Sequence, residues 1–281
     1  MPEGPEVSTV TRQLRKALRN WILVKIEIVS GPYQNNTRSD YLQFRTDLRK
    51  RFVTSTLSNV ASKGKTMYFE LTPVAGDEAV VTRDYISIGL GMTGGFCFDK
   101  QGQKNVRIQF VFESSNGKRT KKLYYIDSRN FGTMKFMRRE ELNEKLNSLG
   151  PTIMNMQIDA DEFAHRFTPS SIQNNEIAKA LMNQKIISGI GNYLRAEILY
   201  EAGVSPKTKV KDMKNADYYK IYEATKKIVK EVMAAGGTVD YRDTANAVGK
   251  YKFKVYRQTK SPNGKQVRKL ILAKRTVYYV E

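Results

Sequence analysis

The first residues of the chain, MPEGPEV, place a proline beside carboxylates, and these residue types could do covalent chemistry. Removal of the initiator Met1 would leave Pro2 with a free secondary amine. An α-amino group has a pKa of about 8, against about 10.4 for lysine, so much more of it is unprotonated near neutral pH. Attack on an aldehydic sugar carbon would form an iminium, which is an electron sink that promotes loss of a phosphate leaving group.

Two acids accompany this amine. Glu3 could shuttle the proton that elimination and ring opening require, and Glu6, one turn further on, could orient the amine. A second interpretation stays open, because Pro-Glu-x-Pro-Glu is also a good helix start in which the acids complement the helix dipole.

Composition narrows the classes of partner. The 281 residues carry 48 Lys and Arg against 28 Asp and Glu, a formal net charge of +20, which favours nucleic acid or an anionic membrane surface. With one cysteine, Cys97, and one histidine, His165, we expect no disulfide, no metal site and no cofactor. The N-terminus lacks a secretory signal, and no apolar run approaches the roughly 20 residues that span a bilayer. We therefore expect a soluble, intracellular protein without a membrane partner.

The elements that must position these residues follow from periodicity. Val7, Val10, Leu14 and Leu18 recur at helical spacing, which predicts a helix from about 5 to 20. Between positions 21 and 137, short β-rich runs alternate with turn residues, a pattern typical of a sandwich or barrel. REELNEKL is helical, and LGPT at 149–152 marks a domain boundary.

The second half of the chain is predicted to be mainly helical. A short SGIG linker, with Gly189 and Gly191, joins two of its helices, and VRKLILAKRTVYYV predicts a terminal hairpin with Lys274 and Arg275 at its tip. The predicted helices cover about 159–167, 175–184, 192–203 and 216–235.

Six short sequence stretches follow one another along the chain in the order found in one enzyme family. Together they resemble the formamidopyrimidine-DNA glycosylase and endonuclease VIII family of base-excision repair enzymes, over nearly the whole sequence. The stretches are PEGPEV, GLGMTG (89–94), DSRNFG (127–132), LMNQKIISGIGNYLRAEILYEAGVSP (181–206), AAGGT (234–238) and AKRTVYY (273–279).

The resemblance implies an α+β fold with DNA in a cleft between domains. It places an N-terminal helix and a two-layer β-sandwich at 2–148, a linker at 149–155, a helix-two-turn-helix domain at 156–248 and a finger hairpin at 249–281. It is most similar to endonuclease VIII-like glycosylases with a zincless finger, because SPNG at 261–264 stands where relatives have the first of two Cys-x-x-Cys pairs, and no second pair follows.

The resemblance also assigns catalytic roles. It implies that Pro2 is the Schiff-base nucleophile, that Glu3 is the acid/base, and that Lys65 contacts a phosphate beside the lesion, with Glu6 in support. An ordinary solvated hairpin lysine is the alternative for Lys65.

DNA-binding roles follow in the same way. Asn192 would open a helix whose free backbone N–H groups and amide hold a phosphate, although a plain N-cap would have the same sequence. Arg275, with Lys274 beside it, would grip phosphates that flank the lesion. The alternative is a charged turn in a basic segment.

A base flipped out of the duplex leaves a hole that must be filled. Met92, Arg129 and Phe131 match the family's void-filling positions, where an apolar wedge and a planar guanidinium suit stacking. A core position is the alternative for Met92 and Phe131. Asn130 departs from the second arginine that relatives often have.

These features predict a monomeric bifunctional DNA glycosylase and AP lyase that acts on damaged double- or single-stranded DNA, in the nucleus or wherever the DNA is. Cleavage would proceed by β- and δ-elimination. The segment between AAGGT and KVYRQ is shorter than in the relatives that close a long loop over oxidised guanine, so the resemblance favours oxidised pyrimidines, ring-opened purines and hydantoins as substrates. Alternatives are an 8-oxoguanine-type purine glycosylase, a non-catalytic DNA-binding module, and a membrane-surface or acidic-protein binder.

Overall fold

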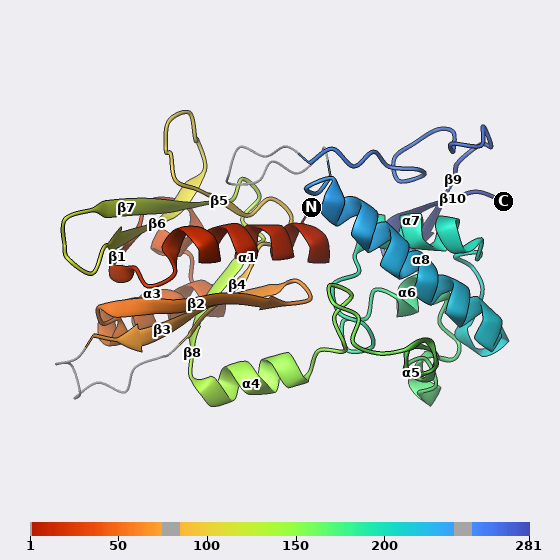
Figure 1. Cartoon of the computed structure of the whole chain (residues 1–281), viewed down its shortest axis with the longest axis horizontal. Helices are drawn as coiled ribbons and strands as arrows, with labels where there is room; N and C mark the ends of the chain where they lie inside the picture. Colours follow the sequence, from red (N-terminus) through yellow and green to blue (C-terminus); the bar gives the residue numbers. More distant parts are fainter. Residues whose placement is uncertain (1, 75–84, 239–248) are drawn as a thin grey trace. The chain divides into compact units, whose positions relative to one another are not determined.

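The chain forms two compact units (Figure 1). The structure is a computed structural model that describes residues 2–74, 85–238 and 249–281. The first unit comprises Pro2 and Glu6–Asn147, and the second comprises Glu3–Pro5, 148–238 and 249–281.

Helix α1 (Gly4–Leu18) confirms the predicted N-terminal helix. Its apolar stripe, from Val7 to Leu18 at intervals of three and four residues, is buried in the core of the first unit. The stripe lies against apolar strand residues, so that burial of one helix face fixes α1 along the sheet (Figure 1).

Within the described residues of the first unit, eight antiparallel strands form one sheet in the order β5-β7-β6-β1-β2-β3-β4-β8. The strands are β1 (Ile22–Ile28), β2 (Ser55–Lys63), β3 (Thr66–Pro73), β4 (Tyr85–Gly89), β5 (Gly95–Cys97), β6 (Val106–Glu113), β7 (Thr120–Ile126) and β8 (Thr133–Met137).

The sheet folds over on itself as a β-sandwich. The rings of Phe69 on β3 and Phe96 on β5 have centroids 6.0 Å apart, and Phe69 lies 5.9 Å from Phe110 on β6. Strand β3 is separated from β5 and β6 by intervening strands, so these rings meet only if the two halves of the sheet face each other. The two-layer sandwich predicted from the sequence is confirmed.

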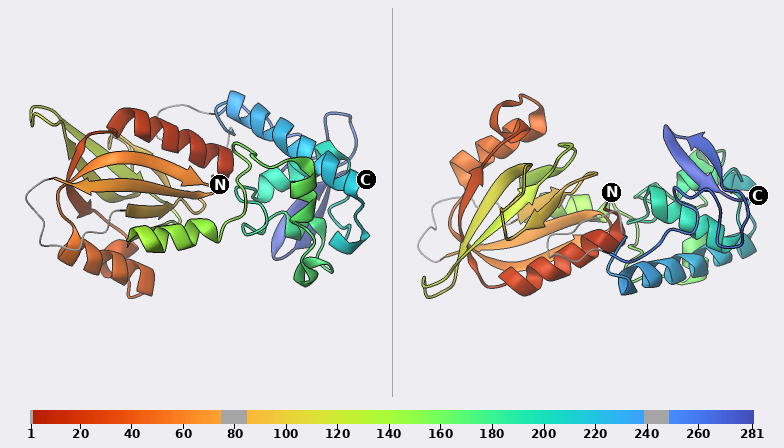
Figure 2. Two further views of the ribbon diagram at one scale, coloured as in Figure 1. Left: turned by 60° about the horizontal axis from the view of Figure 1, so that its bottom comes forward. Right: turned by 90° about the horizontal axis from the view of Figure 1, so that it is seen from above.

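A helical segment inside the predicted β region was missed. Helices α2 (Pro32–Asn35) and α3 (Ser39–Arg51) lie between β1 and β2, and α3 covers the opposite side of the strands from α1 (Figure 2). Tyr41 and Phe44 of α3 are buried, and Phe44 stacks on Phe136 of β8 at 5.4 Å. This apolar face is narrow and most of the helix is polar, so it lacks a strong periodic signal. Helix α4 (Arg139–Asn147) ends the unit.

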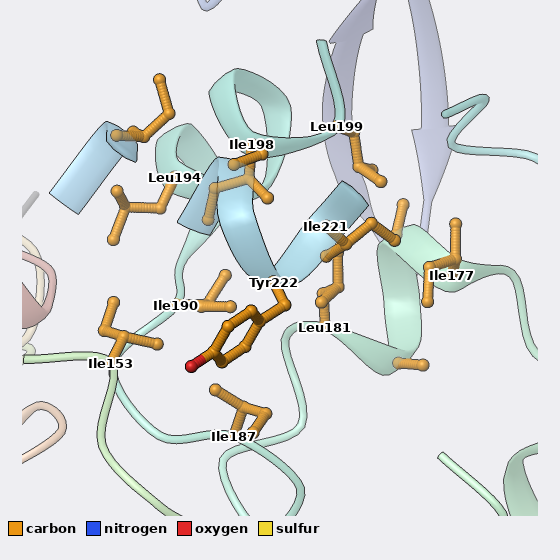
Figure 3. Close-up of a cluster of buried hydrophobic side chains, with 14 of the residues drawn as sticks. Ile153, Ile177, Leu181, Ile187, Ile190, Leu194, Ile198, Leu199, Ile221 and Tyr222 are labelled. Atoms are coloured by element: carbon orange, nitrogen blue, oxygen red, sulfur yellow. The ribbon is translucent and has the colours of Figure 1, made fainter. Parts of the chain in front are cut away.

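Helices of the second unit pack around one apolar core (Figure 3). Ile198 and Leu199 enter this core from one helix, and Ile221 and Tyr222 enter it from another. The phenol of Tyr222 donates a hydrogen bond to the Ile158 carbonyl at 3.0 Å. The helices are α5 (Ala160–His165), α6 (Ile177–Ala180), α7 (Asn192–Ala202) and α8 (Asn215–Ala234), with 3₁₀ turns η1 (Ser170–Ile172) and η2 (Val210–Asp212).

The helix before the SGIG segment is shorter than predicted. Helix α6 ends at Ala180, so turns and not SGIG alone lead into α7. The side chain of Gln184 supplies the reason: its Nε2 donates to the Met182 and Ile190 carbonyls, both at 2.9 Å, and its Oε1 accepts from the Gly189 N–H at 3.0 Å. These bonds replace those that further helical turns would make.

The terminal hairpin is present as β9 (Arg268–Leu272) and β10 (Arg275–Tyr279). Its tip is Ala273–Lys274, both in the left-handed region with φ of 49° and 61°, which matches a two-residue hairpin turn. The predicted tip position of Arg275 is therefore wrong by one residue, because Arg275 is the first residue of β10 and pairs with Leu272. In the part of the chain that the structure describes, no helix is both long and apolar enough to cross a membrane.

Candidate active site

The carboxylate of Glu3 caps the start of α7. Its two oxygens accept backbone N–H bonds from Gly191 at 2.7 Å, Tyr193 at 3.0 Å and Leu194 at 3.2 Å. Glu3 is fully buried, so these bonds are made away from water. Three N–H donors at the positive end of a helix stabilise a carboxylate and fix its position.

The SGIG glycines serve two different purposes. Gly189 has a φ of 108°, a conformation that favours glycine, and its carbonyl accepts the Gly4 N–H at 3.0 Å. Gly191 has ordinary backbone angles, but a Cβ there would lie 2.2 Å from the carboxyl carbon of Glu3. The residue at 191 must therefore lack a side chain to leave room for the carboxylate.

This arrangement corrects one expectation. The N–H groups at the start of α7 were predicted to be free to hold a phosphate, but those of Gly191, Tyr193 and Leu194 bind Glu3 instead. The helix N-terminus favours an anion, as expected, and a side chain of this chain supplies it.

Asn192 is nearly buried, at 9% exposure, and its amide is held on both sides. Its Oδ1 accepts from the guanidinium Nη2 of Arg195 at 2.6 Å, and its Nδ2 donates to the Thr276 carbonyl of β10 at 3.1 Å. The amide thus joins α7 to the terminal hairpin. Sequence reasoning missed Arg195, although its spacing of three residues from Asn192 on a helix was a usable signal.

Arg275 and Lys274 are both exposed on the hairpin. Arg275 neighbours Thr276, whose carbonyl binds Asn192, and its charge contributes to lowering the pKa of Arg195. The structure therefore gathers Glu3, Asn192 and Arg275 around the start of α7.

Pro2 is joined to Glu3 directly before α1, and Glu6 lies buried in the first turn of that helix. Lys65 occupies the two-residue turn between β2 and β3, where Gly64 has a φ of 58°. Lys65 is half-buried in this turn.

Two loops of the first unit are held together by one carboxylate. Asp127 Oδ1 accepts from the Thr93 hydroxyl at 2.5 Å, and Oδ2 accepts from the Gly132 N–H at 2.8 Å. The Arg129 N–H donates to the Thr93 hydroxyl oxygen at 3.0 Å. Asp127 was not singled out from the sequence, although it begins the DSRNFG stretch.

The predicted void-filling residues lie on these two loops. Phe131 is 52% exposed, with the Arg129 guanidinium 4.9 Å from its ring centroid, and Met92 is half-buried. A Cβ at Gly91 would lie 2.5 Å from the Phe131 backbone, so the loops are in close contact. The core alternative is wrong for Phe131. Asn130 adopts a φ of 55°, which asparagine tolerates better than arginine.

A cavity of about 670 Å³ lies at the other end of α7 and is bounded by Tyr200, Gly203, Lys254 and Tyr279 among others. None of the predicted site residues lines it. The residues around Glu3 are therefore separate from this cavity.

Comparison with known proteins fits this geometry. Residues 1–134 match the formamidopyrimidine-DNA glycosylase N-terminal domain, and residues 149–243 match the formamidopyrimidine-DNA glycosylase H2TH domain. Together with the fold, these matches define a helix-two-turn-helix DNA glycosylase. The chain belongs to the formamidopyrimidine-DNA glycosylase family, whose members combine glycosylase and AP lyase activity.

Relatives match along their whole length. A formamidopyrimidine-DNA glycosylase of Prochlorococcus marinus strain MIT 9312 is 30% identical over 96% of this chain and 92% of its own. One from Listeria monocytogenes is 28% identical over 99% and 98%. The Lactococcus lactis Fpg, solved in complex with an abasic-site-containing DNA, has the same fold, with a TM-score of 0.79 at 21% identity over 99% of this chain and 97% of that one.

Proposed function

We propose that this chain removes damaged bases from DNA and then cleaves the sugar-phosphate backbone through an iminium at Pro2. The observation that carries the proposal is the fixed position of the Glu3 carboxylate, next in sequence to the proline whose amine would be the nucleophile. The role requires Pro2 to be the first residue of the mature enzyme, which an intact-mass measurement checks.

The Pro2 nitrogen forms a bond to C1′ as the bond from C1′ to the base breaks, and the departing base takes up a proton. Opening of the sugar ring gives an iminium that cannot become a neutral imine. Loss of a C2′ proton then expels the 3′ phosphate, and a second elimination expels the 5′ phosphate. In this proposal Glu3 would transfer protons in these steps.

For the DNA partner, we propose that Asn192 and Arg275 contact phosphates and that Lys65 adds a further phosphate contact. Met92, Arg129 and Phe131 would fill the space of the flipped base. Exposure of Arg129 and Phe131 on connected loops supports this role, since a wedge must reach the duplex. We further propose that a monomer acts on double-stranded DNA.

For the lesion, we propose ring-opened purines first, because the relatives are named for formamidopyrimidines. Oxidised pyrimidines and hydantoins are a second class, favoured by the short segment between AAGGT and KVYRQ. Most of that segment, 239–248, lies outside the described residues. We also propose a finger without zinc, because residues 249–281 contain neither cysteine nor histidine.

Duplexes with a single formamidopyrimidine, 8-oxoguanine, thymine glycol or dihydrouracil, tested separately and in competition, would check the proposal. We expect base release and a one-nucleotide gap with phosphate ends, fastest for formamidopyrimidine. A Glu3→Gln variant should bind but release base far more slowly. Preference for 8-oxoguanine would favour the purine alternative, and tight binding without product would favour a DNA-binding module.

A further inference from the structure

We propose that Arg195 is a positioning residue that fixes the orientation of the Asn192 amide, so that its N–H donors face the hairpin and the DNA phosphate. This inference rests on the phosphate-binding role proposed for Asn192.

Geometry gives the amide one allowed orientation. A guanidinium can only donate, so the atom that Arg195 Nη2 contacts at 2.6 Å must be the amide oxygen of Asn192. A carbonyl can only accept, so the atom that faces Thr276 O at 3.1 Å must be the amide nitrogen. The contacts with Arg195 and Thr276 therefore require the same orientation of the Asn192 amide, and a flipped amide would lose both hydrogen bonds.

The oriented Asn192 amide has a second N–H donor that a ligand could use. Its NH₂ group has two N–H bonds, and only the one to Thr276 has a partner among the described residues. Thr276 follows Arg275, the residue that is proposed to grip phosphates. A phosphate oxygen would satisfy this donor and the neighbouring guanidinium together.

Arg195 is held from the far side as well. Its Nη1 donates to the Ala178 carbonyl of α6 at 3.1 Å, and the side chain is only 1% exposed. The guanidinium thus lies between α6 and Asn192 and has little freedom to release the amide.

A purely stabilising role fits this residue poorly. The Nε of Arg195 is buried without a hydrogen-bond partner, and no carboxylate of the described residues makes an ion pair with it. Burial lowers the pKa of Arg195 to about 10, while Glu3 opposes and Arg275 reinforces this shift. Burial of a cation with an unpaired N–H lowers the stability of the fold. The contact with Asn192 supplies a functional reason for such a residue.

A double-mutant cycle tests the inference. Asn192→Ala, Arg195→Met and the double variant would be compared with the full wild-type chain for their Kd on a duplex that contains a tetrahydrofuran abasic analogue. Each single variant should weaken binding about tenfold, while the double variant should be no more than twofold weaker than Asn192→Ala. Multiplicative losses would overturn the inference, because Arg195 would then act independently of Asn192.

Two further variants separate orientation from charge and guard against misfolding. Arg195→Lys keeps the charge but loses the two-pronged contact, so we expect it to bind as weakly as Arg195→Met. Asn192→Asp keeps the acceptor for Arg195 but loses the donor, so it should fold and bind as weakly as Asn192→Ala. Wild-type affinity in either variant would contradict the inference.

The wild-type protein distinguishes this failure from a failure of the proposed function. If it neither incises damaged DNA nor binds the tetrahydrofuran duplex, the proposed function fails. If it does both and the cycle is multiplicative, only the role of Arg195 fails.

Discussion

The carboxyl group of Glu3 occupies the space in which a side chain at Gly191 would begin. A Cβ at position 191 would lie 2.2 Å from the carboxyl carbon, and the Gly191 N–H donates to the same group at 2.7 Å. Two residues that are 188 positions apart thus fix each other's position. The start of α7 holds the Glu3 carboxylate, which is the proposed proton shuttle.

Gly191→Ala should displace Glu3 and lower the rate of base release about 100-fold, because small misplacements of catalytic groups are costly. Single-turnover kinetics on a lesion duplex would measure the loss. Gly203→Ala is the matched control: Gly203 ends α7 with a φ of 65° and open space around it, so this variant should lose stability without losing rate per folded molecule. Equal rates for the two variants would show that the close contact with Glu3 is not needed.

Asp127→Asn should disturb the loops that carry Arg129 and Phe131. An amide has one acceptor where the carboxylate has two, so either the Thr93 hydroxyl or the Gly132 N–H would face an NH₂ group. We expect a stability loss of about 1–3 kcal/mol and clearly weaker binding of lesion duplex, measured by urea unfolding and by titration with labelled DNA. In the control Asp99→Asn, the amide oxygen can still accept the one exposed bond, from the Gln101 N–H, so this variant should change neither.

Phe131→Ala tests the wedge directly. Because the ring is 52% exposed, stability should change by no more than about 0.5 kcal/mol, while base release should fall about tenfold through loss of stacking. Met134→Ala, at a position with 1% exposure, should instead cost about 2–5 kcal/mol. The wedge role of Phe131 would be contradicted if Phe131→Ala lost as much stability as Met134→Ala and still excised the base at the normal rate when folded.

Acid stability should depend on Glu201. Burial alone would raise its pKa, but hydrogen bonds from Lys227 and Lys254 outweigh burial and hold the pKa below its ordinary value of 4.5. A lowered pKa in the folded state contributes stability above the ordinary value and loses it as the pH falls through the lowered value. Glu201→Gln should therefore lower Tm by about 2–4 °C at pH 7, with the difference shrinking below about pH 4.5.

The control for this measurement is Glu223→Gln, because Lys226 is the one ion-pair partner of Glu223 among the described residues and the Glu223 side chain is 67% exposed. We expect almost no change in Tm from that substitution. A Glu201→Gln difference that persists unchanged at pH 3 would contradict the assignment, since below the ordinary value of 4.5 the carboxyl of the unfolded chain takes up a proton and the contribution to stability falls.

The parts of the fold that the sequence predicted have strong periodic signals. Val7 to Leu18 define α1, and alternating runs around a two-residue turn define the terminal hairpin. Helix α3 escaped because its apolar face, with Tyr41 and Phe44, is narrow. The early end of α6 escaped because a side chain, Gln184, replaces backbone hydrogen bonds, and no periodicity reports that.

The candidate site likewise contains residues that sequence motifs indicate and residues whose roles depend on contacts in the fold. Pro2 and Glu3 could be proposed from the motif at the start of the chain, and Asn192 could be proposed from the motif at 181–206. The reason for Gly191 could not, because it depends on contact with a residue at the other end of the chain. Asp127 and Arg195 act through other residues, so their roles appear only once the partners of their side-chain atoms are known.

Borohydride trapping on a duplex with one abasic site tests the central claim most directly. Native protein, its N-terminus verified by mass, would be compared with a form in which a retained N-terminal extension blocks Pro2. We predict a covalent adduct from the native form, with the cross-linked peptide beginning at Pro2, and none from the blocked form. An adduct of equal yield from the blocked form would place the nucleophile elsewhere, and tight binding without any adduct from the native form would contradict the iminium mechanism.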